Sequence, residues 1–436
     1  MRAHLGPAMT RIGILAGGGR LPLMIAESAA ARGETVHIVG IEGEADPGIA
    51  RFPHTWVNWG QIGRMVATLR DEGGRQLVIA GAVTRPDLKR IRPDAGFFTS
   101  LPQILRLLGG GDDSVLKRVV RFFEGNGLEV RGVHEVAPDL LAGAGRMGGV
   151  DLSQADRADA EIGFAVRRAL GRVDAGQAVV VANGRVLAIE GAEGTDAMLE
   201  RVAALSLRKE GGGPQGVLAK GPKPGQELRV DMPAIGPRTI EEVAAAGLAG
   251  VVVEAGAVLV LDRAEAIQVA DVRGCAIHGL AGSAPQAAAQ ATTAPRRRVG
   301  RVIGRLRPSR RDADDIERGL ATVVCLAPFA TGSGAVVVRH YVRAIEAAEG
   351  PAAMLERAAS LRRQWGLRWR KVGVFVRRAA DAKEEASALA SLFAQAAAQE
   401  LAGIAVTGPA HALCPYEDAA RLADDLGLFL VLCTAE

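Results

Sequence analysis

The sequence predicts an α/β protein with about three folded domains, and three observations lead to that prediction. Residues 11–39 read as a buried strand, a glycine turn, a helix and a second strand. The composition is rich in Ala, Gly, Val, Leu and Arg and poor in aromatic residues, which suits a soluble α/β protein. Residues 188–201 (AIEGAEGTDAMLER) return almost unchanged at 344–357 (AIEAAEGPAAMLER). Because the two segments are far apart, they indicate duplication of a whole domain rather than a solenoid repeat.

The duplication is informative through both its matches and its losses. Three apolar, strand-like runs also reappear, 177–181 at 334–338, 216–220 at 373–377 and 248–252 at 401–405. At the start of the repeated helix, Thr195 and Asp196 are replaced by Pro351 and Ala352. Residues kept in both copies point to folding, whereas polar residues found only in the first copy point to chemistry.

Length, charge and cysteine use restrict the class of protein. A chain of 436 residues has room for about three domains that each bury a core. A net charge of +4 is small for this length and does not suggest a nucleic-acid partner. The four cysteines lack metal-type spacing, which favours a reduced cytosolic setting. No apolar run approaches the roughly 18 residues of a spanning helix. We therefore expect a cytoplasmic protein, and we leave peripheral contact with the inner membrane open.

The predicted domains are separated by the most basic part of the chain. We expect a nucleotide-binding domain at 9–145, a catalytic domain at 146–282, an arginine-rich linker at 283–312 and a degenerate repeat at 313–436. Apolar residues between 299 and 306 follow one helical face, so one interpretation is a basic amphipathic helix lying on anionic lipid. The other is a solvated tether between two domains.

A glycine turn near the N-terminus predicts nucleotide binding. Gly17, Gly18 and Gly19 follow the first predicted strand and precede a helix with Pro22 in its first turn. Glycines at such a turn let backbone N–H groups approach a phosphate. The dinucleotide pattern G-x-G-x-x-G fails, because Pro22 stands where the third glycine is required. Glu42 follows the second strand like a ribose-binding acid, which keeps a dinucleotide-dependent oxidoreductase as an alternative. A tight turn that binds no ligand is the structural alternative.

Two further polar loops are expected near the same edge of the sheet. Residues 81–87 (GAVTRPD) follow a buried strand, and open α/β sheets bind ligands at the carboxyl ends of their strands. In that loop Arg85 suits a phosphate, with Asp87 close by in sequence. Asp112 and Asp113 enter a predicted helix. They either cap that helix or face a metal ion or a sugar hydroxyl.

The strongest concentration of chemistry lies between residues 220 and 236. Lys220 and Lys223 supply positive charge for a diphosphate, and the prolines and glycines fix an irregular backbone. Asp231 is suited to hold Mg2+ or to orient water. In the repeat, residues 379–399 contain no glycine or proline and read as a helix, so this loop is absent there.

Glu193, Thr195 and Asp196 form a second candidate group. They follow a predicted hairpin whose Asn183-Gly184 turn is a strong local signal, and they start a helix. Helix capping is one interpretation and ligand binding is the other. The loss of Thr195 and Asp196 from the repeat, where the helix itself persists, favours ligand binding.

Taken together, seven segments resemble the bacterial UDP-2,3-diacylglucosamine pyrophosphatases of the LpxI type, which act in lipid A biosynthesis and lack the calcineurin-like phosphoesterase fold. The matching segments are 13–22, 81–87, 111–113, 134–136, 193–196, 223–226 and 230–236. The resemblance covers residues 9 to about 282 and implies that Met9 is the start. The remainder is the degenerate copy, which we expect to pack against its parent or to replace a partner subunit, and a homodimer stays open.

The resemblance implies a Rossmann-like domain, then a mixed α/β domain, with the ligand between them. It implies Mg2+-dependent hydrolysis of UDP-2,3-diacylglucosamine to 2,3-diacylglucosamine 1-phosphate (lipid X) and UMP, with Asp231 at the catalytic aspartate. The expected catalytic residues are Asp231, Lys220 and Lys223, and Asp231 is also the expected metal ligand. The expected substrate-binding residues are Gly17, Gly18, Gly19, Arg85, Asp87, Asp112, Asp113, Glu193, Thr195, Asp196 and Gln226. A noncatalytic sensor of a lipid precursor is a further alternative, motivated by the repeat and the arginine-rich segment.

Overall fold

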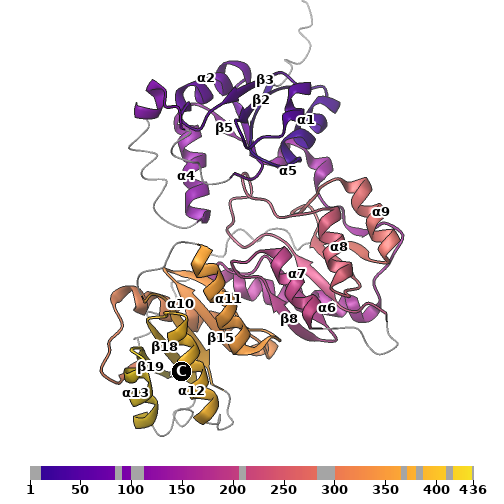
Figure 1. Ribbon diagram of the computed structural model, residues 1–436. Helices are drawn as coiled ribbons and strands as arrows, with labels where there is room; N and C mark the ends of the chain where they lie inside the picture. Colours follow the sequence, from indigo (N-terminus) through magenta and orange to yellow (C-terminus); the bar gives the residue numbers. More distant parts are fainter. Residues whose placement is uncertain are drawn as a thin grey trace, which may run out of the picture. The chain divides into compact units, whose positions relative to one another are not determined.

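Figure 1 shows a computed structural model of the chain, coloured from indigo at the N-terminus to yellow at the C-terminus. The structure describes residues 11–83, 91–99, 112–205, 213–281, 300–364, 371–379, 386–408 and 416–434. The chain divides into two compact units. The first comprises residues 1–143, 226–234 and 255–261, and the second comprises 144–225, 235–254 and 262–436. Both units combine sheets with helices, which confirms the predicted α/β class.

The first unit is built on a five-stranded parallel sheet in the order β3-β2-β1-β4-β5. Its elements are β1 (Arg11–Ala16), α1 (Leu21–Ala31), β2 (Thr35–Ile41), η1 (Pro47–Arg51), β3 (His54–Val57), α2 (Ile62–Glu72), β4 (Gln76–Ala80), α4 (Asp112–Gly125), β5 (Glu129–Val130), α5 (Val133–Val136) and η3 (Pro138–Leu140). Doubly wound sheets of this order bind ligands where the strand order reverses, which here is between β1 and β4.

Apolar side chains cover both faces of this sheet, which explains why its central strands are continuous apolar runs. Ile12 and Ile14 of β1 pack on one face in a cluster with Ile25 of α1. Leu15 points to the other face and packs with Leu69 of α2 and Phe123 of α4. The strand period of two residues therefore places alternate side chains of β1 in two separate cores.

The second unit contains both copies of the repeated domain. The first copy comprises β6 (Gly145–Met147), α6 (Gln154–Leu170), η4 (Gly171–Val173), β7 (Ala178–Ala182), β8 (Arg185–Ile189), α7 (Thr195–Ala204), β9 (Val217–Lys220), α8 (Pro237–Ala245), β11 (Gly250–Glu254), α9 (Arg263–Arg273) and β13 (Ala276–Leu280). Its strands form a mixed sheet in the order β6-β13-β11-β9-β7-β8. The short strands β10 (Ala234–Ile235) and β12 (Leu259–Val260) form a separate pair, and β12 belongs to the first unit.

The second copy, orange to yellow in Figure 1, repeats this architecture. It comprises β14 (Arg301–Ile303), α10 (Arg310–Leu326), η5 (Ala327–Phe329), β15 (Gly334–Val338), β16 (Tyr341–Ile345), α11 (Gly350–Gln364), β17 (Val374–Arg378), α12 (Ala386–Ala398), β18 (Gly403–Gly408), α13 (Tyr416–Asp425) and β19 (Phe429–Thr434). The sheet order β14-β19-β18-β17-β15-β16 is that of the first copy, strand for strand. The predicted domain duplication is therefore visible in the fold.

Two details of the repeat differ from the sequence expectations. The helix suggested between 299 and 306 is wrong, because residues 301–303 form β14 and pair with β19. Strand β14 and the first residues of α10 thus lie inside the segment expected to be a linker. The match of 177–181 to 334–338 is also displaced by one residue. Both hairpins carry an irregularity at the same point, between Val180 and Val181 and between Val336 and Val337, so Ala178 corresponds to Gly334.

The copies share polar contacts that hold the domain together. Ser153 caps α6 in a capping box with Asp156, and Ser309 caps α10 in the same way with Asp312. Inside each copy a buried aspartate on the long helix accepts two backbone N–H bonds from the hairpin turn. Asp159 binds the turn at residues 183 and 184, and its equivalent Asp315 binds the turn at residues 339 and 340. These contacts explain why the same polar residues persist in both sequences.

Candidate active site

The glycine turn packs against the next polar loop at the point where the strand order reverses. The N–H of Gly17 donates to the carbonyl oxygen of Ala80 at 2.8 Å, and that of Gly18 donates to Ala82 at 2.6 Å. A Cβ atom on Gly17 would lie 2.5 Å from the oxygen of Ala82, so only glycine fits there. The tight turn therefore explains the glycine at position 17, and phosphate binding by this turn stays a prediction. Among the described residues, nothing lies within 4 Å of a Cβ built on Gly19.

The other candidates in the first unit are described only in part. Arg85 and Asp87 lie outside the described residues. Asp112 and Asp113 are the first two residues of α4, at the helix start where the sequence places them. Their side chains fall outside the part of the chain that the structure describes, so the choice between capping and ligand binding stays open.

Asp231 lies on a segment of the first unit and is hydrogen-bonded to a second candidate residue. The side-chain amide of Gln226 donates to Oδ2 of Asp231 at 2.6 Å. The backbone N–H of Asp231 donates to the carbonyl oxygen of Glu227 at 3.0 Å, which closes a turn. Asp231 is half-buried. The sequence grouped Gln226 with Asp231 only through the family resemblance, and the structure adds a direct contact that orients the carboxylate.

The neighbours of Asp231 fix the backbone of this segment. Val230 packs against the cluster around Phe123, whereas Met232 packs against the cluster around Ile25 on the opposite face of the sheet. Arg229 makes two 2.8 Å bonds to the carboxylate of Glu227 and a third of 2.8 Å to Glu124 of α4. Asp231 is thus held between two anchored apolar side chains, and a carboxylate fixed in this way needs little reorganisation to act.

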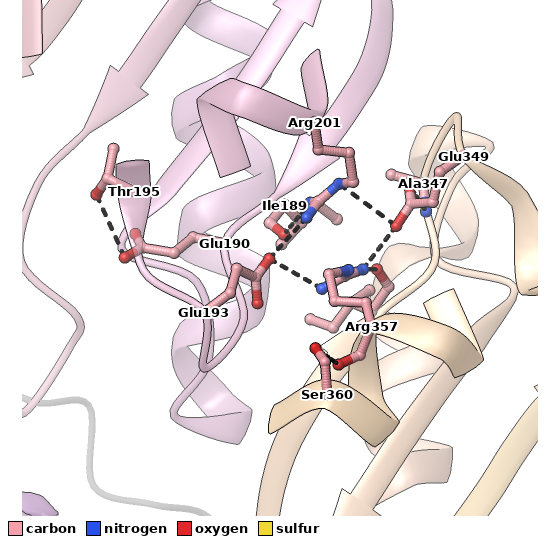
Figure 2. A network of polar contacts seen from close by, with 10 residues as sticks. Ile189, Glu190, Glu193, Thr195, Arg201, Ala347, Glu349, Arg357 and Ser360 are labelled. Atoms are coloured by element: carbon pink, nitrogen blue, oxygen red, sulfur yellow. Dashed lines mark hydrogen bonds and ion pairs between the residues drawn. The ribbon is translucent and has the colours of Figure 1, made fainter. Parts of the chain in front are cut away.

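In the second unit, Lys220 takes part in a buried polar trio. Its Nζ donates to Oγ1 of Thr195 at 3.0 Å, and that hydroxyl donates to Oε1 of Glu190 at 3.3 Å. Each of the three residues is less than a tenth exposed. Figure 2 shows the Thr195 hydroxyl directed at Glu190. The helix cap of α7 is Gly194, with no side-chain cap bond, so Thr195 does not cap the helix. The capping interpretation of Thr195 is therefore wrong.

The sheet topology explains how this trio comes together. Glu190 follows the end of β8, and Lys220 is the last residue of β9. The two strands flank β7, whose first residue Ala178 pairs with Lys220 and accepts the N–H of Glu190 at 2.9 Å. Residues far apart in sequence thus meet at one end of the sheet.

Burial and charge act against each other in this trio. Burial raises the pKa of Glu190, while the nearby ammonium of Lys220 opposes that shift. Burial lowers the pKa of Lys220, and the carboxylates of Glu190, Asp196 and Glu242 oppose that shift. One oxygen of Glu190, Oε2, is buried without a hydrogen-bond partner in the described structure. A buried carboxylate and ammonium whose pKa values are both shifted are typical of functional sites.

Two other predicted residues lie on the same copy. Asp196 is half exposed and forms a 2.9 Å ion pair with Arg238 of α8. Arg238 also bonds Glu242 at 2.8 Å, and burial, followed by the Asp196 charge, raises the pKa of Glu242. The Nζ atom of Lys223 lies 3.8 Å from Oδ1 of Asp174.

Arg167 of α6 anchors the backbone between Lys220 and Lys223. Its Nε donates to the carbonyl oxygen of Gln177 at 2.9 Å, and its Nη2 donates to that of Pro222 at 2.9 Å. Burial lowers the pKa of Arg167 to about 10, with the Glu254 carboxylate opposing the shift, so the guanidinium stays charged at neutral pH. Arg167 therefore supports the segment that carries the second predicted catalytic lysine.

Glu193 contacts arginines of both copies of the domain. Its side chain is 4% exposed, and Oε1 accepts bonds of 2.9 Å from both Arg201 and Arg357. Arg357 belongs to the second copy of the domain. The structure thus gives Glu193 a contact between copies, and its role in substrate binding stays a prediction.

The predicted residues therefore fall into two groups. Gln226 and Asp231 belong to the first compact unit, whereas Thr195, Asp196, Lys220 and Lys223 belong to the second. Sequence reasoning missed Glu190 and Arg167. Glu190 was overlooked because the repeat keeps it as Glu346, and Arg167 because its replacement by Val323 lies outside the segments that were compared.

The described residues fit Mg2+ in one way only. No group of three or more His, Cys, Asp or Glu side chains among them is arranged to hold a metal ion. Mg2+ is, however, commonly held by one or two carboxylates together with substrate phosphates. The single oriented carboxylate of Asp231 fits that mode. In the same described part of the chain, no helix combines the length and apolar character that a membrane crossing requires.

The fold and the site define a two-domain α/β protein whose second domain is present twice. Sequence comparison gives the same division. The sequence model of the LpxI N-terminal domain matches residues 11–140, and that of the LpxI C-terminal domain matches twice, at 143–278 and 300–431. The chain belongs to the LpxI family. It is 43% identical over 274 residues to the UDP-2,3-diacylglucosamine pyrophosphatase LpxI of Caulobacter vibrioides. The alignment covers 62% of this chain and 98% of the relative.

Proposed function

We propose that this protein hydrolyses UDP-2,3-diacylglucosamine to 2,3-diacylglucosamine 1-phosphate and UMP in lipid A biosynthesis. The observation that carries the proposal is the family match. The LpxI domain models match residues 11–140, 143–278 and 300–431, and a named pyrophosphatase aligns over 62% of this chain and 98% of its own length. The aligned part includes the Asp231 segment. We further propose that the reaction takes place in the cytoplasm, with the acyl chains drawn from the inner-membrane surface.

The reaction breaks one P–O bond of the diphosphate and adds water across it. The oxygen of water joins one phosphorus, the bridging oxygen leaves with the other phosphate, and the water protons pass to the products and to solvent. Asp231 lies on an anchored backbone and receives a hydrogen bond from Gln226, so its carboxylate is oriented before substrate arrives. We assign Asp231 to the metal and to the orientation of water.

Lys220 and Lys223 are assigned to the charge of the diphosphate. Lys220 is held by Thr195 and balanced by Glu190, so its ammonium has a fixed position. Lys223 follows on the segment that Arg167 anchors. Both residues would neutralise negative charge that increases at the phosphate oxygens in the transition state.

Mg2+, when bound between Asp231 and the phosphates, would supply further neutralising charge at the reacting phosphorus. The support for this assignment is the fit of one oriented carboxylate to a metal held mainly by substrate. Removal of divalent cations with a chelator should abolish turnover, and added Mg2+ should restore it. Turnover that continues at the same rate in chelator would remove the metal from the proposal.

The most direct test is mass spectrometry of small molecules carried by the Asp231→Ala protein. We expect turnover to be lost while substrate affinity is retained, because a carboxylate that acts mainly in the transition state affects kcat more than binding. The variant should therefore carry UDP-2,3-diacylglucosamine after purification from a bacterium that makes it. Bound NAD would favour an oxidoreductase instead, and near-normal turnover by the variant would exclude the role of Asp231.

The matched control for this experiment is Asp71→Ala. Asp71 is an exposed aspartate of the same unit, and its carboxylate forms an ion pair with the neighbouring residue Arg70. This substitution removes a carboxylate, as Asp231→Ala does, but it lies outside the segment that carries Asp231. We expect wild-type turnover from this control and no retained substrate. Binding of the glycolipid without turnover by the wild-type protein would instead favour a noncatalytic sensor.

A further inference from the structure

The two copies of the repeated domain contact each other through equivalent residues. Glu193 and Arg201 of the first copy correspond to Glu349 and Arg357 of the second. Within each copy, glutamate and arginine pair, at 2.9 Å and 2.6 Å respectively. Across the copies, Arg357 lies 2.9 Å from Glu193, and Arg201 lies 3.7 Å from Glu349. Figure 2 shows the four side chains alternating in one cluster between the two domains.

Backbone contacts repeat the same relation. The N–H of Ala192 donates to the carbonyl oxygen of Arg343 at 3.1 Å, and the N–H of Ala348 donates to that of Leu187 at 3.2 Å. Ala192 is equivalent to Ala348, and Leu187 is equivalent to Arg343. The second bond is therefore the first with the two copies exchanged.

An apolar cluster shared by the two copies includes four equivalent pairs, although most of its members belong to the first copy. It contains residues from the ends of α6 and α10 and from the hairpin strands β8 and β16. The pairs are Leu170 with Leu326, Val173 with Phe329, Val186 with Val342, and Ile189 with Ile345. The ion pairs, the backbone bonds and these four apolar pairs thus follow one approximate two-fold relation.

A surface that contacts its own copy through exchanged pairs is self-complementary, as in the interface of a symmetric dimer. We propose that the face formed by β8, residues 190–194 and Arg201 is a self-association surface, and that the second copy is a tethered partner that occupies it. The occupant of this face is thus a second domain of the same kind. This inference goes beyond the proposed hydrolysis and does not rest on it.

The face has physical reasons to need a partner. Strand β8 is at the edge of its sheet, and an uncovered edge strand offers unpaired backbone groups to other chains. Glu193 and Arg201 are 4% and 14% exposed in the side chain, and removal of the second copy would take away the partner charges that surround them. The Caulobacter vibrioides relative matches over 98% of its length without a second copy.

The covalent link between the copies also explains why the second copy, rather than a second molecule, occupies this face. Linking two domains makes their contact intramolecular, with an effective concentration in the millimolar range for a short flexible linker. One contact favours the second copy specifically. Arg318 donates to the carbonyl oxygen of Val173 at 3.0 Å, whereas the residue equivalent to Arg318 in the first copy is Ile162, which has no such donor.

The test begins with the full chain, carrying a site-specific protease sequence inserted between residues 283 and 299. After cleavage we expect the two pieces to elute together at the mass of the intact chain, 45.4 kDa. The purified piece 1–282 corresponds to the whole length of the relative. It should be folded by circular dichroism, and light scattering should give twice its monomer mass. A folded piece that stays monomeric up to about 100 μM would overturn the proposal.

Charge reversal separates the proposed face from nonspecific association. Arg201→Glu in piece 1–282 would bring four carboxylates together in a dimer, so we expect the dimer to weaken on the order of 100-fold or more. Arg273→Glu is the matched control, because Arg273 is exposed on α9 and should leave the dimer unchanged. Equal effects from both variants, or none from Arg201→Glu, would contradict the proposal.

A second measurement applies if piece 1–282 does not fold alone. Arg357→Glu in the full chain changes only the second copy. After cleavage, we expect the dissociation constant of its two pieces to be on the order of 100-fold higher than that of the wild-type pieces. Pieces that separate equally well with and without this change would show that the ion-pair cluster does not hold the copies together.

Discussion

The two copies of the C-terminal domain have the same sheet and differ at one end of it. In the first copy Thr195 bridges Glu190 and Lys220, and Arg167 anchors the segment after Lys220. In the second copy the glutamate is kept as Glu346 and the lysine position holds Arg377, but threonine and the anchoring arginine are gone. The buried pair of opposite charges is therefore compatible with folding alone. The bridging hydroxyl and the anchored loop are what distinguish the copy expected to act on a phosphate.

A third group of residues is retained for a different reason. Glu193 and Arg201 persist as Glu349 and Arg357. Each pair forms an ion pair inside its own copy and also contacts the other copy, so pairing of the copies is a reason for the retention beyond the stability of each domain. Comparison of two copies within one chain thus separates residues for folding, for pairing and for chemistry, and variants at equivalent positions test each group.

The largest difference between the copies should follow removal of the buried cation. We expect Lys220→Met to lower kcat by roughly 10²- to 10³-fold, because one preorganised charge at the phosphate is lost. Since burial already raises the pKa of Glu190, that carboxyl can take up a proton and the domain should remain folded.

Arg377→Met is the matched variant in the second copy, and it should leave turnover unchanged. The comparison requires steady-state kinetics of both proteins and circular dichroism to establish folding. Equal losses of activity in the two variants would contradict the assignment of chemistry to the first copy.

Most of the fold and part of the site can be predicted from this sequence. The glycine turn and the apolar runs around Ile14 and Val179 predict buried strands correctly, because periodicity and turn residues act locally. The contact of Thr195 with Lys220 cannot be predicted in this way, since it depends on which strands flank β7. The contact of Glu193 with Arg357 cannot be predicted locally either, because it joins the two copies of the domain.

The next largest effect should come from replacing, in the first copy, the two polar residues that the second copy lacks. In the double variant Thr195→Val and Asp196→Ala, Lys220 loses its hydroxyl partner and one nearby carboxylate. We expect kcat to fall by about 10- to 100-fold, less than for loss of the charge itself. The reverse changes, Pro351→Thr and Ala352→Asp, should add no activity. A double variant with wild-type kcat would show that the bridge has only a structural role.

The second copy has Arg377 at the position of Lys220, and this difference suggests a test by pH. Burial lowers the pKa of Lys220 below the 10.5 of an ordinary lysine, so its proton is lost at a lower pH than in water. If the charge is needed, wild-type turnover should fall as the pH rises through that lowered value. Lys220→Arg keeps its charge at alkaline pH. Its alkaline limb in a profile of kcat against pH should therefore lie at higher pH, whereas an unchanged limb would assign that limb to another group.

The smallest effect should be equal in the two copies, because it concerns folding only. Ser153 and Ser309 each accept the N–H of the third residue of a long helix, and each is bonded to an aspartate in return. Ser153→Ala and Ser309→Ala should each lower the free energy of unfolding of their own domain by about 1 kcal/mol. For a domain of this size the change corresponds to roughly 4 °C in the melting temperature measured by calorimetry. Turnover at 25 °C should be unaffected by Ser309→Ala. A loss of several kcal/mol from one cap alone would mean that the two copies do not rely on the cap equally, despite its identical geometry.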